Sequence, residues 1–276
     1  MLMRADDDTW QALREEITTL VREEPILASY LHATVINHRT LEDSLSYLLA
    51  GKLASPDLPA MSMREVIADA LEASPEIREA IRRDLAAAVD RDPAAHGVAN
   101  PFLNHKGFHA LQAYRVSHWY WREGRRALAL YLQSRISEVF SVDIHPAAVL
   151  GSGVFIDHAT GVVIGETAVV GDNVSMLQGV TLGGTGKETG DRHPKIGSGV
   201  LLSAGATVLG NIRIGACSKV GAGSVVLQDV PPRSTVVGVP ARVVGRPSSE
   251  QPALCMDQHF EQQQNGAESK RAGGRG

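Results

Sequence analysis

The chain has 276 residues, enough to bury one large core or two modest ones. Its net charge of −4, with 21% charged residues, argues against a nucleic-acid partner, which usually requires a basic excess. The acidic first residues lack the apolar core of a signal peptide, and no apolar run approaches the length of a membrane helix. Two cysteines do not indicate a disulfide framework. We therefore expect a cytoplasmic protein with neither a membrane nor a nucleic-acid partner.

Glycine divides the chain into unlike parts. Of the 27 glycines, 4 precede residue 144 and 19 lie between residues 144 and 246. A glycine-poor segment followed by a glycine-rich one predicts two domains that are built differently. We place them at 1–140 and 141–246, and we expect the polar segment 247–276 to be a flexible tail.

The first domain is predicted to be all-α, because its apolar residues recur at spacings of three and four. Three helix starts carry capping signals: Asp8 with Gln11, Ser62 with Glu65, and Ser74 before Pro75. Two further helices are expected over 107–121 and 125–139. The stretch 90–107 between the Ser74 helix and these two is rich in Pro, Gly and Asn, and we expect it to be irregular.

The second domain repeats in units of six residues. An aliphatic residue or methionine begins each of twelve units: Ile144, Leu150, Ile156, Ile164, Val170, Met176, Ile196, Leu202, Val208, Ile214, Val220 and Val226. The frame requires two extra residues, assigned to Val162-Val163, and an inserted loop over 182–195. Such a period predicts a parallel β-helix in which three units make one coil and residues about 18 apart lie above one another.

A few polar residues depart from this repeat. Asp157 and His158 occupy a unit whose second position is usually glycine, Asp143 precedes the first unit, and the inserted loop carries Arg192 and His193. Asp143 and His158 are a little less than one coil apart, so we expect them to meet across a turn. A carboxylate beside an imidazole fixes its tautomer and makes it a general base. Each residue taken alone also fits a solvated surface.

Several motifs together resemble the bacterial serine acetyltransferases, from the first helices to about residue 246. They are DIHPAA, DHATGVVIGETA, GVTLGGTGK, GDRHPKIG, GAGSVVL and, in the helical half, GFHALQAYR. The resemblance implies that the β-helix is left-handed. It also implies acetyl transfer from acetyl-CoA, as co-substrate and without a metal, to the hydroxyl of L-serine, with inhibition by L-cysteine at the serine site.

The resemblance assigns roles to named residues. The catalytic pair is His158 with Asp143. Asp92 and Asp157 bind the serine ammonium, and Arg192 and His193 bind its carboxylate. Coenzyme A lies along the coils against Gly184, Thr185, Ala204, Lys219 and Ala222, and Gly184 also offers a backbone N–H to the developing oxyanion.

The resemblance further implies an assembly. Members form homotrimers with active sites between subunits, so that His158 of one chain faces His193 of the next, and trimers pair through the helical halves into hexamers. The family tail commonly ends in an isoleucine that binds O-acetylserine sulfhydrylase. This chain ends in Arg275-Gly276, which puts that complex in doubt.

The residues themselves leave three other functions open. The repeat also fits a hexapeptide acyltransferase that acts on a sugar or on homoserine. It fits a zinc lyase of the γ-carbonic-anhydrase type, for which the solenoid offers His145, His158 and His193 as ligands. A non-catalytic scaffold for pathway partners is the third.

Overall fold

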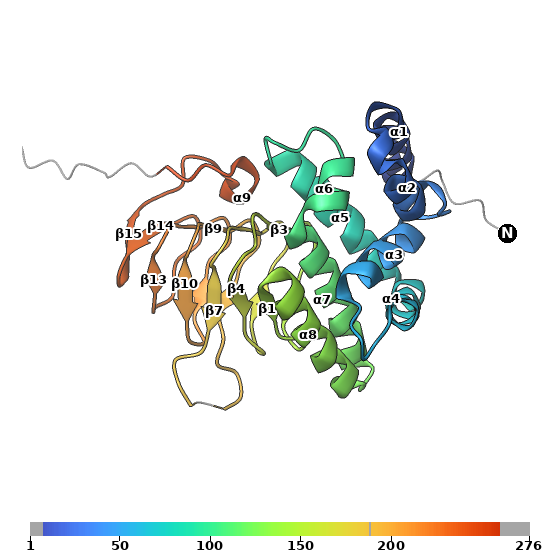
Figure 1. Ribbon diagram of the computed structural model, residues 1–276. Coiled ribbons are helices and arrows are strands. Elements are labelled where there is room, and N and C mark those ends of the chain that lie inside the picture. The colour runs from blue at the N-terminus through green and yellow to red at the C-terminus, as the bar shows by residue number, and fades with distance from the viewer. Residues whose placement is uncertain (1–7, 188, 260–276) are drawn as a thin grey trace, which may run out of the picture.

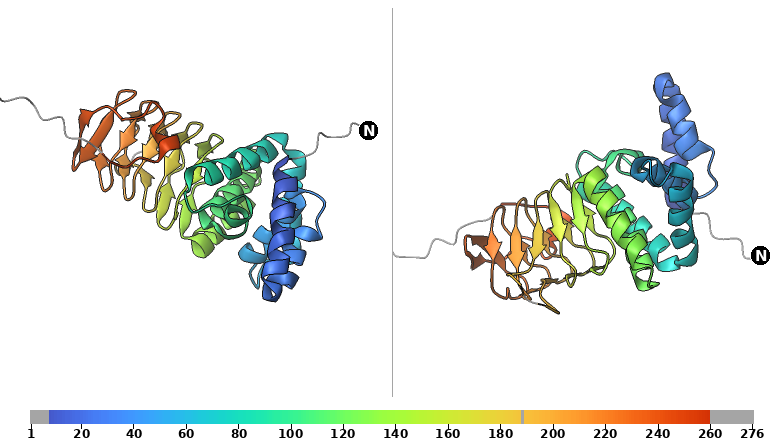
Figure 2. Two further views of the ribbon diagram at one scale, coloured as in Figure 1. Left: turned by 90° about the horizontal axis from the view of Figure 1, so that it is seen from above. Right: turned by 60° about the horizontal axis from the view of Figure 1, so that its bottom comes forward.

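A computed structural model describes residues 8–187 and 189–259 of the chain, as a helical half stacked on one end of a β-solenoid (Figure 1). None of the described helices is both long and apolar enough to cross a membrane. The helical half contains α1 (Asp8–Glu23), α2 (Ala28–Leu31), α3 (Leu41–Leu53), α4 (Ala60–Ala73), α5 (Pro75–Arg91), α6 (Ala99–Asn104), α7 (Lys106–Arg122) and α8 (Arg126–Phe140), with a 3-10 turn at Pro25–Leu27 and a π turn at His32–Ile36. Two further views show α1 on the side of this half away from the solenoid (Figure 2).

Most of the predicted helix boundaries agree with the structure. Ser74 caps α5, its hydroxyl accepting a hydrogen bond from the Ile77 N–H at 3.3 Å, and α7 and α8 lie within a residue of their expected ranges. The start predicted at Ser62 is wrong, because α4 begins at Ala60 after Pro59, whose fixed φ suits the entry to a helix. The stretch expected to be irregular contains the short helix α6.

The solenoid consists of three parallel sheets. Sheet A is β1 (Val142–Ile144), β4 (Val162–Ile164), β7 (Thr181–Gly183), β10 (Thr207–Leu209) and β13 (Val225–Val226). Sheet B is β2 (Val149–Leu150), β5 (Val169–Val170), β8 (Lys195–Ile196) and β11 (Arg213–Ile214). Sheet C is β3 (Phe155–Ile156), β6 (Ser175–Met176), β9 (Leu201–Leu202), β12 (Lys219–Val220), β14 (Thr235–Gly238) and β15 (Ala241–Gly245). The antiparallel pair β14–β15 closes the end away from the helices (Figure 1).

The predicted six-residue frame describes the core of the solenoid. All twelve unit-starting residues are buried, and partners in the regular coils, such as Leu201 and Lys219, lie 18 residues apart. The predicted insertion begins too early, since Leu182 is fully buried and pairs with Ile164 and Val208. The extra residues therefore follow Gly183.

The two extra residues of the first coil lie in a corner and not in a strand. Ile156 pairs with Met176 and Val163 pairs with Thr181. The first coil therefore takes seven residue steps, from Ile156 to Val163, where the next coil takes five, from Met176 to Thr181. The prediction that Val162-Val163 are the additions is wrong, because both belong to β4. The enlarged corner is 157–161, which contains Asp157 and His158.

A buried ion pair joins the helical half to the solenoid. Arg115 of α7 contacts Asp84 of α5 at 2.7 Å, and Arg115 also donates to the Gly151 carbonyl. The second oxygen of Asp84 accepts from the backbone N–H of Val154 at 2.9 Å. Burial raises the pKa of Asp84, and Arg115 opposes that shift. Each end of the pair therefore also binds the backbone of the first coil.

The start of α7 lies directly against the enlarged corner. A Cβ atom on Gly107 would lie 2.0 Å from the Ile156 carbonyl oxygen, so only glycine permits this approach. The Lys106 ammonium donates to the Thr160 hydroxyl. The two contacts fix α7 on both sides of Asp157 and His158.

The expected flexible tail needs a correction in its first part. Helix α9 (Pro252–Cys255) packs on sheet C with Ala253 fully buried. The Ser175 hydroxyl donates to the Ala253 carbonyl at 2.7 Å, and Arg91 of α5 donates to the same hydroxyl at 3.0 Å. The remainder of the predicted tail, 260–276, lies outside the described residues, as does the C-terminus.

We expect His109 to make the fold sensitive to acid. Its imidazole is buried in α7 and donates from Nε2 to the Phe102 carbonyl at 2.7 Å, and burial lowers its pKa to about 4. Because the unfolded chain takes up this proton first, the stability that His109 contributes is complete above pH 6.5 and is lost as the pH falls toward 4, by up to about 3 kcal/mol.

The measurement compares the wild type with His109→Gln in urea unfolding at several pH values and one protein concentration. The glutamine keeps a donor and does not titrate, so the advantage of the wild type should shrink between pH 6.5 and 4. A stability difference that does not change with pH would contradict the prediction.

Gly107→Ala should destabilise the fold by about 1–3 kcal/mol, since the added methyl group collides with backbone. The matched control is Gly51→Ala in α3, where an added Cβ meets nothing within 4 Å and helix propensity predicts a gain of up to about 1 kcal/mol. Thermal unfolding of both variants tests this. Equal effects of the two substitutions would refute the close approach at Gly107.

Candidate active site

Four polar residues gather where the helical half meets the enlarged corner. Asp92 is the C-cap of α5, His105 links α6 to α7, and Asp157 and His158 lie in the corner after β3. The His105 Nε2 lies 3.5 Å from Asp92 Oδ2, and the His158 Nε2 lies 3.7 Å from Asp157 Oδ2. The charges of Asp92, Asp157 and His158 all act on the pKa of His105, which burial lowers. Both halves of the chain therefore contribute to one polar group.

His158 projects from the corner in an unusual backbone conformation. His158 and Ala159 both have positive φ angles, 56° and 62°, which side chains with a Cβ rarely adopt. Such strain concentrates at functional sites. The His158 side chain is 72% exposed in the single chain, so its imidazole is open to a substrate or to a neighbouring subunit.

The structure does not bring Asp143 into hydrogen-bond or ion-pair contact with His158 among the described residues. Asp143 lies on β1 in register with Val163, and its Oδ1 accepts a hydrogen bond from Gln133 at 2.7 Å. The assignment of Asp143 as the partner of His158 stays a prediction.

Arg192 and His193 form a second group on the inserted loop. Arg192 makes an ion pair of 2.7 Å with Glu166, and the His193 Nδ1 accepts from the Thr167 N–H at 3.1 Å. The proton of the neutral His193 ring is therefore on Nε2. A Cβ at Gly165 would lie 2.1 Å from that ring, so this glycine makes the space that the imidazole occupies.

Burial also lowers the pKa of His193, and the charge of Arg192 acts in the same direction. Burial lowers the pKa of the neighbouring His145 as well. The His145 ring packs edge-on against Trp121, with the ring centroids 5.1 Å apart. The Arg192 guanidinium beside these imidazoles can bind an anionic group that shares or replaces Glu166 as its partner.

The two groups lie on opposite edges of sheet A. Asp157 and His158 belong to the turns that lead from sheet C into sheet A, called here the His158 edge (157–161, 177–180, 203–206, 221–224). Arg192 and His193 belong to the turns that lead from sheet A into sheet B, the His193 edge (145–148, 165–168, 184–194, 210–212). One chain therefore does not assemble the six predicted catalytic and serine-binding residues in one place.

The predicted coenzyme A residues divide in the same way. Gly184 and Thr185 are on the His193 edge, whereas Ala204 and Ala222 are on the His158 edge. Lys219 differs from expectation, because it is buried on β12 and its ammonium donates to the His259 carbonyl, with Asp257 at 4.0 Å. In this conformation the C-terminal segment occupies the side of the Lys219 ammonium where a ligand phosphate would bind.

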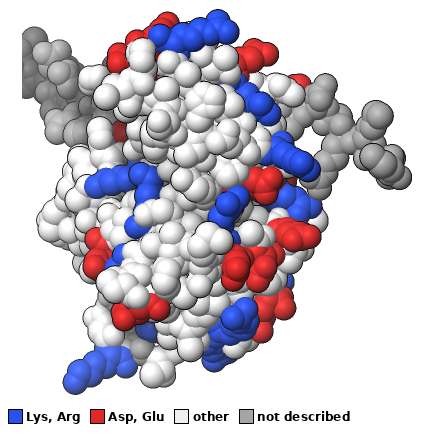
Figure 3. Space-filling model, turned by 45° about the vertical axis from the view of Figure 1, so that its right-hand side comes forward, with Lys and Arg blue, Asp and Glu red and all other residues white. Residues whose placement is uncertain are grey.

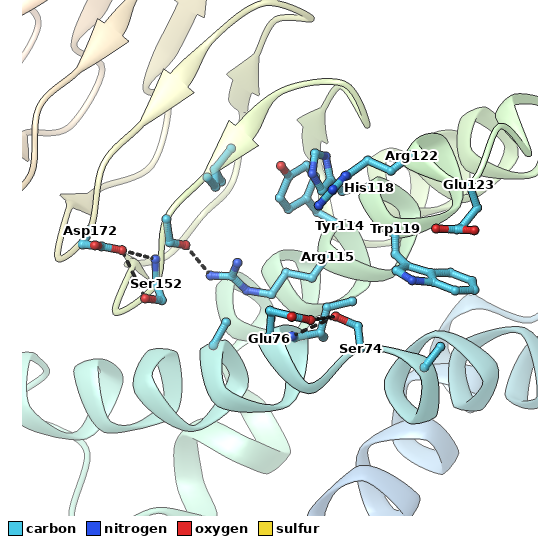
Figure 4. A pocket seen from close by; sticks show the side chains of 15 residues that line it. Ser74, Glu76, Tyr114, Arg115, His118, Trp119, Arg122, Glu123, Ser152 and Asp172 are labelled. Atoms are coloured by element: carbon cyan, nitrogen blue, oxygen red, sulfur yellow. Dashed lines mark hydrogen bonds between the residues drawn. The ribbon is translucent and has the colours of Figure 1, made fainter.

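A cavity of about 520 Å3 opens elsewhere, between α5, α7 and the turns that join sheet B to sheet C (Figure 4). Arg115, His118 and Arg122 face Glu76 and, across the opening, Asp172. It contains none of the predicted site residues, and its charges of both signs select no ligand class.

Several residues of these groups carry little signal in the sequence. His105 lies in a stretch expected to be irregular, and its approach to Asp92 follows from the docking of α7. Glu166 and Thr167 lie in the unit IGETAV, which fits the six-residue repeat. The only sign of a functional role in this unit is that a carboxylate and a hydroxyl occupy adjacent corner positions. Gly165 resembled an ordinary small corner residue.

Comparison with known proteins identifies the family. Residues 9–113 match the family described as serine acetyltransferase, N-terminal, and residues 193–228 match the bacterial transferase hexapeptide. The serine acetyltransferase of Escherichia coli is 56% identical over 251 residues, covering 91% of this chain and 92% of that protein. An Arabidopsis thaliana serine acetyltransferase is 52% identical, covering 91% of this chain and 71% of that one.

The fold agrees with a solved relative. A crystal structure of serine acetyltransferase from Vibrio cholerae superposes with a TM-score of 0.91 at 57% identity, covering 93% of this chain and 99% of that chain. Identity at this level over nearly the whole length includes both the helical half and the solenoid. The chain belongs to the serine acetyltransferase family.

Proposed function

We propose that the chain transfers the acetyl group of acetyl-CoA to the hydroxyl of L-serine, giving O-acetyl-L-serine and CoA. The observation that carries the proposal is the gathering of Asp92, Asp157 and His158 at the enlarged corner, an acidic place for an ammonium beside an exposed imidazole. Family relatives support the ligands: one from Brucella abortus is in complex with coenzyme A, a soybean relative is complexed with serine, and another is a complex with cysteine.

The end of α5 suits an ammonium group. Asp92 follows the last turn of this 17-residue helix, where unpaired carbonyls and the helix dipole favour a cation. Its Oδ1 accepts from the Ala94 N–H at 2.8 Å, which fixes the carboxylate. Serine held here by its ammonium would present its hydroxyl toward His158.

His158 then acts as the general base. A serine hydroxyl is a poor nucleophile until a base takes its proton in the transition state. As the hydroxyl oxygen bonds to the thioester carbonyl carbon, the proton passes to His158, and collapse of the tetrahedral intermediate expels the CoA thiolate. Asp143 is proposed to orient the imidazole, and the Gly184 N–H to stabilise the oxyanion.

The complete site is proposed to form between subunits of a homotrimer. The His158 edge carries the ammonium-binding acids and the base, and the His193 edge carries Arg192 and His193 for the carboxylate. Because the two edges bound the same sheet, the His158 edge of one chain would meet the His193 edge of the next in a closed ring. The coenzyme A residues, which divide in the same way, would complete the same groove.

A column of glycines supports the proposed course of coenzyme A. Gly179, Gly205 and Gly223 stack on the His158 edge beside Ala204 and Ala222: a Cβ on Gly179 would lie 3.4 Å from Gly205, and one on Gly205 would lie 3.9 Å from Gly223. Backbone without side chains lets a ligand approach closely. Contact with Lys219 requires that the segment carrying Asp257 and His259 first leave its ammonium.

The helical halves offer a surface through which trimers could pair into the proposed hexamer. Ile26 and Met61 are 87% and 72% exposed, and Tyr30, Tyr47 and Met61 line an apolar pocket of about 390 Å3. The helical end shows charges of both signs interspersed with uncharged surface (Figure 3). Inhibition by L-cysteine at the serine site and a cytoplasmic location are also part of the proposal.

His158→Ala should lower turnover by about 10²–10⁴-fold, the usual contribution of a general base. Fold and assembly should be unchanged, because the side chain is largely exposed. The measurement is thiol release from acetyl-CoA with serine, alongside His96→Ala as an exposed-histidine control. A wild type that turns over homoserine or amino sugars but not serine would refute the proposed acceptor.

Mixed assemblies should test the shared site. His158→Ala and Arg192→Ala are each expected to inactivate a homotrimer. When the two variants are co-expressed in equal amounts, one of the three sites in each mixed trimer, about a quarter of all sites, should pair two intact edges and regain activity. Thiol release by the purified mixture that stays at the level of the single variants would argue for a site within one chain.

A further inference from the structure

Lys195 occupies a position that the proposed mechanism does not use. It begins β8, where the inserted loop returns to sheet B, and its backbone N–H donates to the Ile212 carbonyl at 2.8 Å. Its neighbours in the sheet are Val169 on one coil and Arg213 on the next. The side chain is 20% exposed. The solenoid therefore fixes the backbone of Lys195, and the side chain is mostly covered.

The Lys195 ammonium is surrounded by acceptors. It donates to the Thr167 carbonyl at 2.6 Å and to the His193 carbonyl at 2.9 Å. It also donates to Asp191 Oδ1 at 2.5 Å, and this hydrogen bond lowers the pKa of Asp191. The other oxygen of Asp191 accepts from the Asn211 amide at 3.3 Å. A lysine ammonium carries three N–H donors, and here all three are used.

These acceptors lie on both sides of the residues proposed to bind the serine carboxylate. Asp191 directly precedes Arg192, and the His193 carbonyl directly follows the two side chains. On the opposite side, the Thr167 hydroxyl accepts from the Arg192 N–H at 3.0 Å and from the His193 N–H at 3.1 Å. The backbone of 191–193 is therefore held between Thr167 and Lys195, and Lys195 binds Thr167 as well.

The other end of the inserted loop is held without Lys195. The Gly210 N–H donates to the Gly183 carbonyl at 2.9 Å, where the loop leaves β7. A Cβ on Gly210 would lie 3.2 Å from the Thr185 methyl group, so Thr185 packs against the next coil. Gly184 and Thr185, the coenzyme A residues proposed for this loop, belong to that end. The contacts of Lys195 thus act on the carboxylate-binding end alone.

We infer that Lys195 is a positioning residue for the carboxylate of serine, acting through Arg192 and His193. It ties the end of the loop that carries them to a strand of the solenoid, and it takes no part in acetyl transfer. The inference rests on the proposed role of Arg192 and His193 in serine binding. It predicts a loss of recognition that depends on the charge of the acceptor carboxylate.

The test begins with wild-type thiol release, whose absence with serine would overturn the proposed function and not this inference alone. In active enzyme, Lys195→Met should raise the KM for serine about tenfold, because it removes hydrogen bonds of a charged group. The KM for acetyl-CoA and kcat should change by less than about threefold. The variant should fold, since Asp191 is 56% exposed and its carboxylate stays solvated without Lys195.

Two small molecules distinguish carboxylate recognition from a general disturbance of the loop. L-Serine methyl ester keeps the ammonium and the hydroxyl but lacks the negative charge, so its kcat/KM should differ by less than about threefold between Lys195→Met and the wild type. L-Cysteine keeps the carboxylate, and its inhibition constant should rise by the same factor as the serine KM.

Two further variants serve as controls. Arg213→Met changes the exposed basic residue at the equivalent strand position of the next coil and should behave as wild type. Asp191→Asn added to Lys195→Met should raise the serine KM no further, because the hydrogen bond between the two side chains is already lost.

Either of two results would overturn the inference. One is a serine KM within about twofold of wild type in Lys195→Met. The other is an equal loss of kcat/KM for serine and for its methyl ester together with a lower unfolding temperature, which would mean that Lys195 only maintains the fold.

Discussion

The active site depends on the docking of the helical half against the first coil of the solenoid. Asp84 and Arg115 are buried at this junction, and each also binds solenoid backbone, at Val154 and Gly151. A buried ion pair is weak evidence for stability, because desolvation offsets its attraction. The raised pKa of Asp84 reflects that cost. What the pair supplies is geometry, since any other relative placement of the halves would remove the hydrogen bonds of Asp84 to the Val154 N–H and of Arg115 to the Gly151 carbonyl.

That geometry determines which residues can act together. With α5 and α7 held on the first coil, Asp92 at the end of one helix and His105 at the start of the other lie above the corner that carries Asp157 and His158. The close approach at Gly107 sets the spacing, because backbone meets backbone there. The serine-binding end of the site is thus a property of the junction, and neither half alone contains it.

Sequence reasoning succeeded where periodicity is strict and failed where the outcome depends on contacts between distant segments. The aliphatic frame identified the core of the solenoid, and Ser74-Pro75 identified the start of α5, because both signals are local. The six-residue frame places Leu182 in the insertion, because the frame alone does not distinguish the last strand residues from the start of a loop. The burial of Lys219 could not be foreseen, because it depends on the C-terminal segment packing across sheet C. The ring of His105 reaches Asp92 only through the tertiary docking.

The enlarged corner explains why the unit IDHATG departs from the repeat. A regular corner needs only small residues, but this one spans seven positions where the next coil spans five, from Ile156 to Val163. The added length is accommodated by His158 and Ala159 in left-handed conformations, so the chain bulges outward at the imidazole. Ile156 still fills the core, and the strands on either side keep their register with the next coil. An insertion of two residues in a rigid repeat can therefore project a reactive side chain without altering the scaffold that positions it.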